Sequence, residues 1–319
     1  MGFENTENIQ AATLKQYRFN SFKPSPKLIR ALVEEHNGTR TRAQKVLKGP
    51  GFTNWTLKMY QYFDWNLLWE CLAFGYPVTA AVALASGAFT NTQKISSNVP
   101  TGSILFNMGP HWEKYLGASI DEMTVTIDPT KPTMITYKGV AHEVVTNVAA
   151  PTPVAISSAA YNHPVMGLAA VSVNSSPYAK LLSGSITIKF GRKPIHTIVE
   201  TTDMQRAEEG EVVGSFDFLA RYTAHTGSFY ENQVNNTSPG GISVVFNDLI
   251  TDIGTGTPTH PQRSLSIGNP LINEDAELDP EKPEVTQHIK GTFGYSSADA
   301  SAFVNAYRNE LAAAVFVGS

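Results

Sequence analysis

The stretch that decides the fold is residues 123–140, Met-Thr-Val-Thr-Ile-Asp-Pro-Thr-Lys-Pro-Thr-Met-Ile-Thr-Tyr-Lys-Gly-Val. Apolar residues such as Val125 and Ile127 alternate with polar ones, which is the period-2 pattern of a strand with one buried face. Two prolines then interrupt the run, because proline lacks a backbone N–H and has a fixed φ. The alternation resumes through Tyr137 and Gly139. The stretch therefore predicts a β-hairpin with a six-residue connection.

Short blocks around this hairpin recur later in the chain in the same order. Ser103–Asn107 returns as Ser243–Asn247, Thr124–Ile127 as Ser264–Ile267, Tyr137–Gly139 as Ile289–Gly291, and the alternating strand after Gly51 as the strand after Gly214. Four blocks in one order predict a duplicated all-β unit. The predicted repeated hairpins carry Val125, Ile127, Tyr137 and Gly139 in the first copy and Leu265, Ile267, Ile289 and Gly291 in the second.

Length and composition favour two β-rich domains. The chain has 319 residues, 42% of them apolar and only 16% charged. This composition fits β-rich proteins, and also proteins whose surface is largely covered by neighbours. We predict an N-terminal arm at 1–24, a first domain at 25–146, a linker at 147–180 and a second domain at 181–319. The net charge of −4 argues against a dedicated DNA-binding protein with a basic stripe, although nucleic acid could still slide past such a surface.

Neither a disulfide nor a targeting segment is predicted. Cys71 is the single cysteine, so no intramolecular disulfide can form, and its apolar surroundings indicate a buried, inert thiol. The N-terminus is acidic and polar, unlike a signal peptide. The longest apolar run, Val78–Phe89, is too short to span a bilayer. We expect a protein that is made in a cytoplasm and kept soluble there.

One helix is strongly predicted. Asp64 can cap a helix that runs through Phe74 and is ended by Gly75. Its apolar stripe recurs at the helical spacing i, i+3, i+4, i+7 and forms the core of the first domain through Trp65, Leu68, Trp69 and Leu72. Further helices are predicted at 25–33 and 297–311, and a weaker pattern predicts a short helix at 225–234.

Residues 76–102 are rich in Ala, Ser, Thr and Asn and carry little charge. A loop of this length is uncommon in a compact domain unless it has a function. It is either a mobile surface loop or an arm that reaches a neighbouring subunit. The candidate inter-subunit residues are Thr79, Ser86, Asn91 and Thr92. We expect deletion of residues 80–98 to leave a folded monomer that no longer assembles.

No motif for catalysis or for metal or cofactor binding is found. The histidines form no HExxH or HxH pattern and do not pair with cysteine, so zinc has no sequence support. A nucleophile elbow and a P-loop are both absent. The acidic segment 270–283 lacks the spacing of the usual calcium loop. We therefore predict no catalytic residue, no metal and no cofactor.

The order of parts resembles the major tail tube protein of long-tailed bacteriophages. The matching parts are the Gly51–Tyr60 strand, the Trp65–Gly75 helix, the Ser103–Asn107 strand and the hairpin that ends in Tyr-Lys-Gly. The resemblance covers roughly residues 25–311 and implies β-barrel or β-sandwich units with a flanking helix. In that family the sheets join edge to edge into a ring around a continuous inner barrel.

The resemblance also implies a function and partners. Single-unit members form hexameric rings, so two units imply a trimeric, pseudo-sixfold ring that stacks head to tail into a tail tube for DNA delivery. The implied partners are the chain itself, the tape measure, distal tail and terminator proteins, and double-stranded DNA in passage, with no membrane anchor. The implied location is the virion tail, after assembly in the host cytoplasm. The acidic balance would suit a lumen that repels phosphates.

Other functions remain open at this point. A type VI secretion tube or a distal tail protein would share the fold. A carbohydrate- or receptor-binding β-sandwich module would need exposed aromatic residues on loops. The tryptophans stand mostly in core-like patterns, which weakens that reading: Trp55, Trp65, Trp69 and Trp112. An enzyme is the third choice.

Overall fold

The computed structural model is mainly β, which confirms the predicted fold class. It describes residues 1–4, 10–35, 43–77, 82–85, 88–153, 170–173, 176–177, 181–194, 207–208, 210–221, 240–248, 253, 260–272, 277–279, 286–295 and 301–309. Within these residues the structure has one α-helix, α1 (Trp65–Phe74).

The strands before the predicted linker are β1 (Gly2–Phe3), β2 (Ser21–Glu35), β3 (Ala43–Tyr60), β4 (Val82–Ala85), β5 (Ala88–Lys94), β6 (Gly102–Asn107), β7 (Trp112–Ile127), β8 (Met134–Ala141) and β9 (Glu143–Val148). Those that follow are β10 (Ala170–Val173), β11 (Ser176–Pro177), β12 (Leu181–Lys189), β13 (Lys193–Pro194), β14 (Ala207–Glu208), β15 (Val213–Arg221), β16 (Ile242–Asn247), β17 (Gln262–Ile267), β18 (Asn269–Ile272), β19 (Glu277–Asp279), β20 (Thr286–Gly294) and β21 (Phe303–Asn309).

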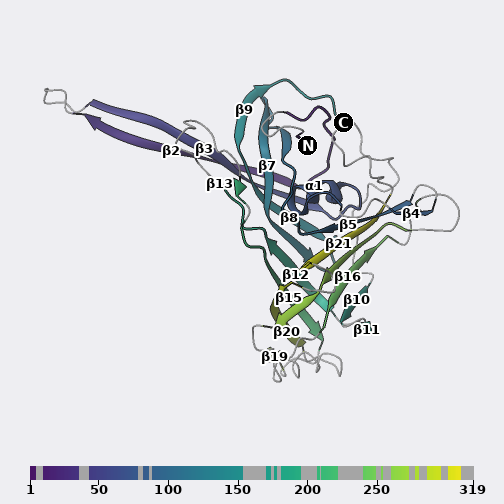
Figure 1. Ribbon diagram of the computed structural model, residues 1–319. Helices are drawn as coiled ribbons and strands as arrows, with labels where there is room; N and C mark the ends of the chain where they lie inside the picture. Colours follow the sequence, from purple (N-terminus) through teal and green to yellow (C-terminus); the bar gives the residue numbers. More distant parts are fainter. Residues whose placement is uncertain are drawn as a thin grey trace.

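Two large antiparallel sheets make up most of the molecule. The path β18-β20-β15-β12-β7-β8-β3-β2, here called the main sheet, takes four strands from each side of residues 154–169. The second sheet has the order β11-β10-β16-β17-β21-β5-β4. The N-terminal half of β7 leaves the main sheet to pair with β6 and β9. Helix α1 lies between these layers (Figure 1).

The hairpin at residues 123–140 is confirmed. Strands β7 and β8 pair antiparallel, with Val125 opposite Ile135 and Met123 opposite Tyr137. The alternate side chains Met123, Val125 and Ile127 are buried, as the period-2 pattern requires. The connection between the strands covers residues 128–133.

The predicted helix at 25–33 is wrong, because residues 21–35 form strand β2. Ser25-Pro26 was interpreted as a helix start, but proline is also tolerated in an edge strand, which is the position of β2. Strand β3 also continues through Gly49-Pro50-Gly51, although Gly and Pro in this order are typical of a turn. At that point the β2–β3 register shifts, so the glycines and proline mark a bulge.

The β2–β3 hairpin projects from the body as an arm, drawn in purple at the upper left of Figure 1. Its backbone pairing continues from Ser21↔Lys58 at the root to Glu35↔Ala43 at the far end. The projecting part is therefore a ladder of two strands, without a third strand pairing to it among the described residues.

The predicted closing helix at 297–311 is wrong as well, because residues 303–309 form strand β21. The buried positions of β21 are Phe303, Asn305, Tyr307 and Asn309. Two of these four inward side chains are amides, and two of the three outward ones are apolar, so the strand lacks the usual apolar-in alternation. The predicted helix at 225–234 lies outside the described residues.

Two segments predicted as connections contain strands. Residues 76–102 hold β4 and β5, and β5 pairs with β21, so the prediction of a loop is wrong there. The predicted linker 147–180 holds β10 and β11, and β10 pairs with β16. The division into two domains stays a prediction; a single apolar cluster contains side chains from both sides of residues 154–169.

The second copy of the hairpin does not form between the predicted segments. Leu265 and Ile267 lie on β17, which pairs with β16 and β21 in the second sheet. Ile289 and Gly291 lie on β20, which pairs with β15, β18 and β19 in the main sheet. All four residues are buried. The alternation of β17 was real, but alternation does not specify which strand is the partner.

Candidate assembly surfaces

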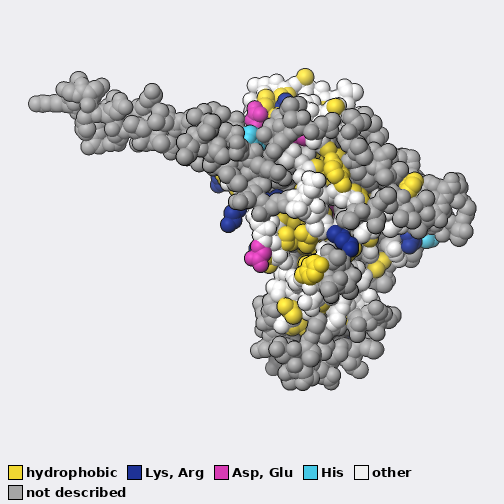
Figure 2. Space-filling model, viewed as in Figure 1, with side chains coloured by type: hydrophobic (Ala, Val, Ile, Leu, Met, Phe, Trp, Pro, Cys, Tyr) yellow, Lys and Arg dark blue, Asp and Glu magenta, His cyan; other side chains and the backbone are white. Residues whose placement is uncertain are grey.

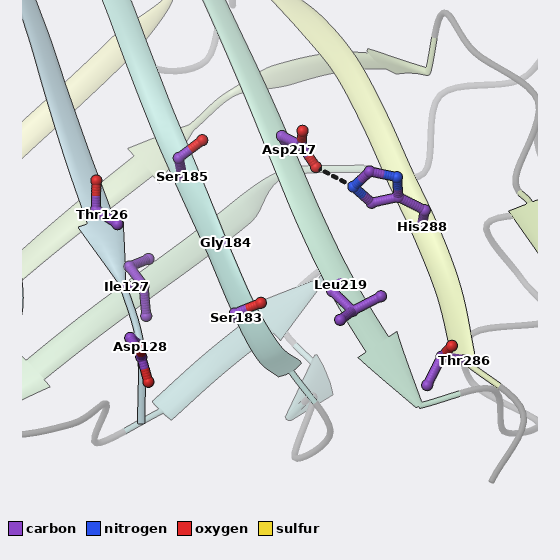
Figure 3. A pocket seen from close by; sticks show the side chains of 10 residues that line it. All are labelled: Thr126, Ile127, Asp128, Ser183, Gly184, Ser185, Asp217, Leu219, Thr286 and His288. Carbon is purple, nitrogen blue, oxygen red and sulfur yellow. Dashed lines mark ion pairs between the residues drawn. The ribbon is translucent and has the colours of Figure 1, made fainter. Parts of the chain in front are cut away.

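The strands β7 and β12 join the two parts of the main sheet at its centre. Their register places Thr124 opposite Thr187 and Thr126 opposite Ser185. The hydroxyl oxygens of Thr124 and Thr187 are 3.1 Å apart, so one hydrogen-bonds to the other across the junction. Figure 3 shows one end of this junction, with Thr126 on β7 and Ser185 on the neighbouring β12. The junction thus joins two groups of four strands edge to edge: β7-β8-β3-β2 and β18-β20-β15-β12.

Among the described strands, the main sheet ends at β2 on one side and at β18 and β19 on the other. An unpaired strand edge offers N–H and C=O groups to any strand that arrives. Two large apolar side chains are exposed near the second edge: Leu271 on β18 is 50% exposed and Tyr295, after β20, is 67% exposed. Exposed apolar side chains beside an open edge are typical of a surface that a partner covers.

Prolines are found on both open edges. Pro24 and Pro26 stand on β2 and Pro270 stands on β18. Proline has no N–H, so in a sheet its nitrogen faces away from the paired neighbour. On β2 the nitrogens of Pro24 and Pro26 therefore face the open side. Such prolines reduce indiscriminate pairing at an edge.

One face of the main sheet packs on the core and the other is polar. Hydroxyl side chains follow one row of this polar face through Thr136, Thr124, Thr187, Ser215 and Thr292. The described basic side chains on it are Lys23, Lys27, Lys58, Lys138, Lys189, Arg221 and Lys290, and the described acidic ones are Glu122, Asp128 and Asp217. Figure 2 shows Lys and Arg side chains standing out near the root of the arm. The described part of this face is net basic, opposite in sign to the whole chain.

The polar face also holds an ion pair near one end. The Nε2 atom of His288 on β20 is 2.5 Å from a carboxylate oxygen of Asp217 on β15. Figure 3 shows both side chains at an open hollow that Thr286 and Leu219 also line. Both side chains are more than one third exposed, so solvent screens the pair and its contribution to stability is small.

Beneath the sheet, Glu70 of α1 accepts four hydrogen bonds in the core. Its Oε1 accepts from Tyr137 at 2.9 Å and from Arg263 at 2.7 Å. Its Oε2 accepts from Asn305 at 2.6 Å and from Tyr307 at 2.7 Å. These five residues, here called the Glu70 cluster, come from α1, β8, β17 and β21. The cluster therefore ties the helix to strands from both parts of the chain.

Arg263 and Glu70 form a salt bridge in which both side chains are 0% exposed. Burial lowers the pKa of Arg263, but the Glu70 carboxylate together with Tyr307 and Tyr137 more than offsets this, so its pKa is raised. Its guanidinium also donates to Asn305 at 3.0 Å and to Gln61. Burial is the main cause that raises the pKa of Tyr307 well above its usual value, so its hydroxyl stays a donor. The donors and acceptors of the ion pair are matched, as burial of two charges requires.

Arg192 closes the C-terminal end of α1. Its guanidinium donates to the carbonyl of Leu72 at 2.7 Å, to that of Ala73 at 2.8 Å, and to that of Ile120. The last carbonyls of a helix have no partner within the helix and carry partial negative charge, so a buried guanidinium there is stabilising. Its backbone N–H donates to Asp121. Arg192 thus connects the helix, β7 and the segment after β12.

We expect Arg192→Met to lower the free energy of unfolding by about 2 kcal/mol, the usual range for hydrogen bonds to a charged group. Urea denaturation followed by tryptophan fluorescence measures the loss. Arg221→Met, at an exposed position, is the matched control and should change stability by less than about 0.5 kcal/mol. Equal losses in the two variants would contradict the capping role.

The structure places the predicted helix residues in the core: Trp65, Leu68, Trp69 and Leu72 are all buried. The helix ends at Gly75 as predicted, with φ of 92°, while Asp64 makes no side-chain capping hydrogen bond. Trp55 is also buried and Trp112 is partly buried. The sequence analysis missed Glu70, Arg192 and Arg263. The one available signal was an acidic residue inside an otherwise apolar helix.

The candidate inter-subunit residues fall into two groups. Thr79 and Ser86 lie outside the described residues. Asn91 and Thr92 lie on β5, and Asn91 is buried with its amide 2.9 Å from the Asn309 side-chain oxygen. Because β4 and β5 belong to the second sheet, deleting residues 80–98 would remove two paired strands as well as the connections. A role of this segment between subunits stays a prediction.

No group of three metal-ligating side chains suited to hold an ion occurs in the part of the chain that the structure describes. No described helix combines the length and apolar character needed to cross a membrane.

The comparison with protein families decides the identity. The family model described as phage tail tube protein matches residues 46–296. The chain belongs to the phage tail tube protein family. This family membership confirms the resemblance, and it makes the chain a structural tail protein and so a component of the virion. A search of curated proteins finds no match. For a tail tube protein, open sheet edges and a net basic polar face become candidate surfaces for assembly and for the lumen.

Proposed function

We propose that this tail tube protein forms trimeric rings with pseudo-sixfold symmetry, which stack into the tube that delivers DNA. The observation that carries the proposal is the order of the main sheet. Its eight-strand path divides at the β7–β12 junction into two groups of four, joined edge to edge. A junction inside the chain is a direct template for the junction between chains. If the same edge-to-edge pairing is repeated between copies around an axis, both open edges of each copy become paired, as in a closed barrel.

In such a ring the polar face of the main sheet would line the lumen, because the opposite face is covered by the core. The described part of this face does not support the expectation of an acidic, phosphate-repelling surface. Rows of threonine and serine with scattered lysines would make weak, exchangeable contacts with a DNA backbone. We infer that DNA meets a hydrated surface during delivery.

The contacts between rings need a different surface. The β2–β3 arm projects from the body (Figure 1), and its backbone pairing continues out to Glu35↔Ala43. We propose that it contacts the neighbouring ring, together with the segment around residues 79–92. A head-to-tail contact of this kind is heterologous and gives a filament. Tape measure, distal tail and terminator proteins would meet the ends of that filament.

Negative-stain electron microscopy of the purified chain at high concentration tests the proposal. We expect hollow rings of three double-lobed subunits in end-on views, and tubes in side views. A chain that stays monomeric even when incubated with short tube fragments as seeds would contradict self-assembly. Rings with six subunits would contradict the trimer.

A further inference from the structure

We propose that the ring closes by pairing β19 of one copy with β2 of the next, in the register that places Asp279 opposite Lys23. This inference rests on the proposed ring and specifies its interface. The partner is a second copy of this chain. The register is argued from pairings inside one chain, taken strand by strand below.

The two four-strand groups share a register in their middle strands. In the first group Trp55 on β3 lies opposite Gly139 on β8. In the second group Phe216 on β15 lies opposite Gly291 on β20. In both pairs a Cβ added to the glycine would meet the opposite aromatic ring. The repeated aromatic and glycine pair aligns β3 with β15 and β8 with β20.

The outer strands then align without further assumptions. Pro24 on β2 lies opposite Trp55, and Ile186 on β12 lies opposite Phe216. Position 24 therefore corresponds to position 186, and by the same count Lys23 corresponds to Ser185. The open edge of β2 corresponds to the edge that β12 gives to β7.

The other open edge aligns in the same way. Thr126 on β7 lies opposite Met134 on β8, and Asp279 on β19 lies opposite Thr286 on β20. Met134 and Thr286 stand at the same distance along the chain from Gly139 and Gly291. Position 279 on β19 therefore corresponds to Thr126, which is the residue that faces Ser185 across the internal junction.

Transferring the internal junction to the ring places Asp279 opposite Lys23, and Glu277 opposite Ser25. An acidic strand thus meets a basic one, and Lys23 is exposed in the single chain. Opposite charges directly across a strand pair are stabilising, and like charges are destabilising. The internal junction has an opposite-charge pair of its own, with Glu122 opposite Lys189.

The prolines of β2 make this charge pairing more important. Pro24 and Pro26 correspond to Ile186 and Ile188, which can donate to β7 through their N–H groups. The proposed junction therefore has fewer backbone hydrogen bonds than the internal one. Because fewer backbone hydrogen bonds join β2 to β19, the charge pairs contribute a larger share of the affinity between the two copies. It also discourages pairing with strands that lack the acidic residues.

Cysteine cross-linking tests the register. Directly opposite positions have Cα atoms about 4.5–5.5 Å apart, within the range of a disulfide. After mild oxidation of assembled rings, we expect Lys23→Cys/Asp279→Cys to give covalent trimers that persist in denaturant. The native Cys71 is buried and burial raises its pKa, so it should not interfere. The control Ser25→Cys/Asp279→Cys places one cysteine two residues out of register and should cross-link at least tenfold less.

A charge exchange tests the same pair if the cysteine variants assemble poorly. We expect Lys23→Glu and Asp279→Lys each to raise the concentration needed for rings by roughly tenfold or more, and the double variant to restore it. Lys58→Glu, on the same face but away from the edge, is the control. Suppose that the wild type forms rings, but rings of Lys23→Cys/Asp279→Cys do not cross-link, or the double charge variant does not restore assembly. Either result would overturn the inferred register and leave the proposed ring standing. Failure of the wild-type chain to form rings would overturn both.

The charge pairing also predicts salt dependence. At about 1 M salt the screening length falls to about 3 Å, so ring formation should weaken relative to low salt. The Lys23→Glu/Asp279→Lys variant should respond like the wild type. A variant with both charges removed, Lys23→Gln/Asp279→Asn, should respond much less, and an equal response would overturn the electrostatic part of the inference.

Discussion

We expect Glu70→Ala to lower the free energy of unfolding by about 3–5 kcal/mol, the largest loss predicted for a single substitution in this chain. The substitution leaves Arg263 charged, fully buried and without its carboxylate. It also removes the acceptor of the Tyr137, Asn305 and Tyr307 hydrogen bonds. An uncompensated buried charge is far more costly than a lost surface contact. Because stabilities of whole domains are about 5–15 kcal/mol, this loss is a large part of the total and should lower the urea midpoint markedly.

Two companion variants separate the charge from the packing. Glu122→Ala removes one partner of the Glu122–Lys138 pair, in which Lys138 is 54% exposed, and should cost at most about 1 kcal/mol. Glu70→Leu/Arg263→Met replaces both charges by apolar side chains and should recover much of the loss. Urea denaturation of the soluble variants provides the comparison. If Glu70→Ala were no more destabilising than Glu122→Ala, the Glu70 cluster would not hold the fold together.

The partners of Glu70 in the Glu70 cluster could not be predicted from the sequence. Glu70 stands in a run of apolar helix residues, which indicates that it is buried but not what it binds. Its cation, Arg263, lies far along the chain on a strand that was recognised only by its alternation. No local pattern connects the two, because their contact is made by tertiary packing. An acidic residue among the apolar residues of a buried helix therefore predicts a buried cation elsewhere in the chain.

The sequence-based prediction was correct for elements in which one face is uniformly apolar. Strand β7 and helix α1 bury regular stripes, so period and burial agree. Strand β21 was misassigned because its inward positions include Asn305 and Asn309, which serve the buried polar network. Strand β2 was misassigned because prolines at an open edge mimic a helix start. In both cases a requirement of packing or assembly outweighed the local signal.

Substitution of Gly139 or Gly291, each opposite an aromatic ring, is expected to have the second large effect on stability. A Cβ on Gly139 would overlap the Ser119 carbonyl oxygen and the Trp55 ring, and a Cβ on Gly291 would overlap the Leu271 carbonyl oxygen and the Phe216 ring. A backbone carbonyl in a sheet cannot move without breaking its ladder. We expect Gly139→Ala and Gly291→Ala each to lower the free energy of unfolding by about 3 kcal/mol, the upper end for overpacking.

Gly294→Ala is the matched control, because it lies on the same strand as Gly291 and a Cβ there meets nothing within 4 Å. Alanine restricts the unfolded chain more than glycine, so this variant should gain about 0.4–1 kcal/mol. Chemical denaturation of the three variants therefore predicts two losses of similar size and one gain. Similar losses at 139 and 291 would support the equivalence of the two strand groups, on which the proposed ring register depends. A loss at only one position would show that the aromatic and glycine pairs are not equivalent, and the register would then need another basis.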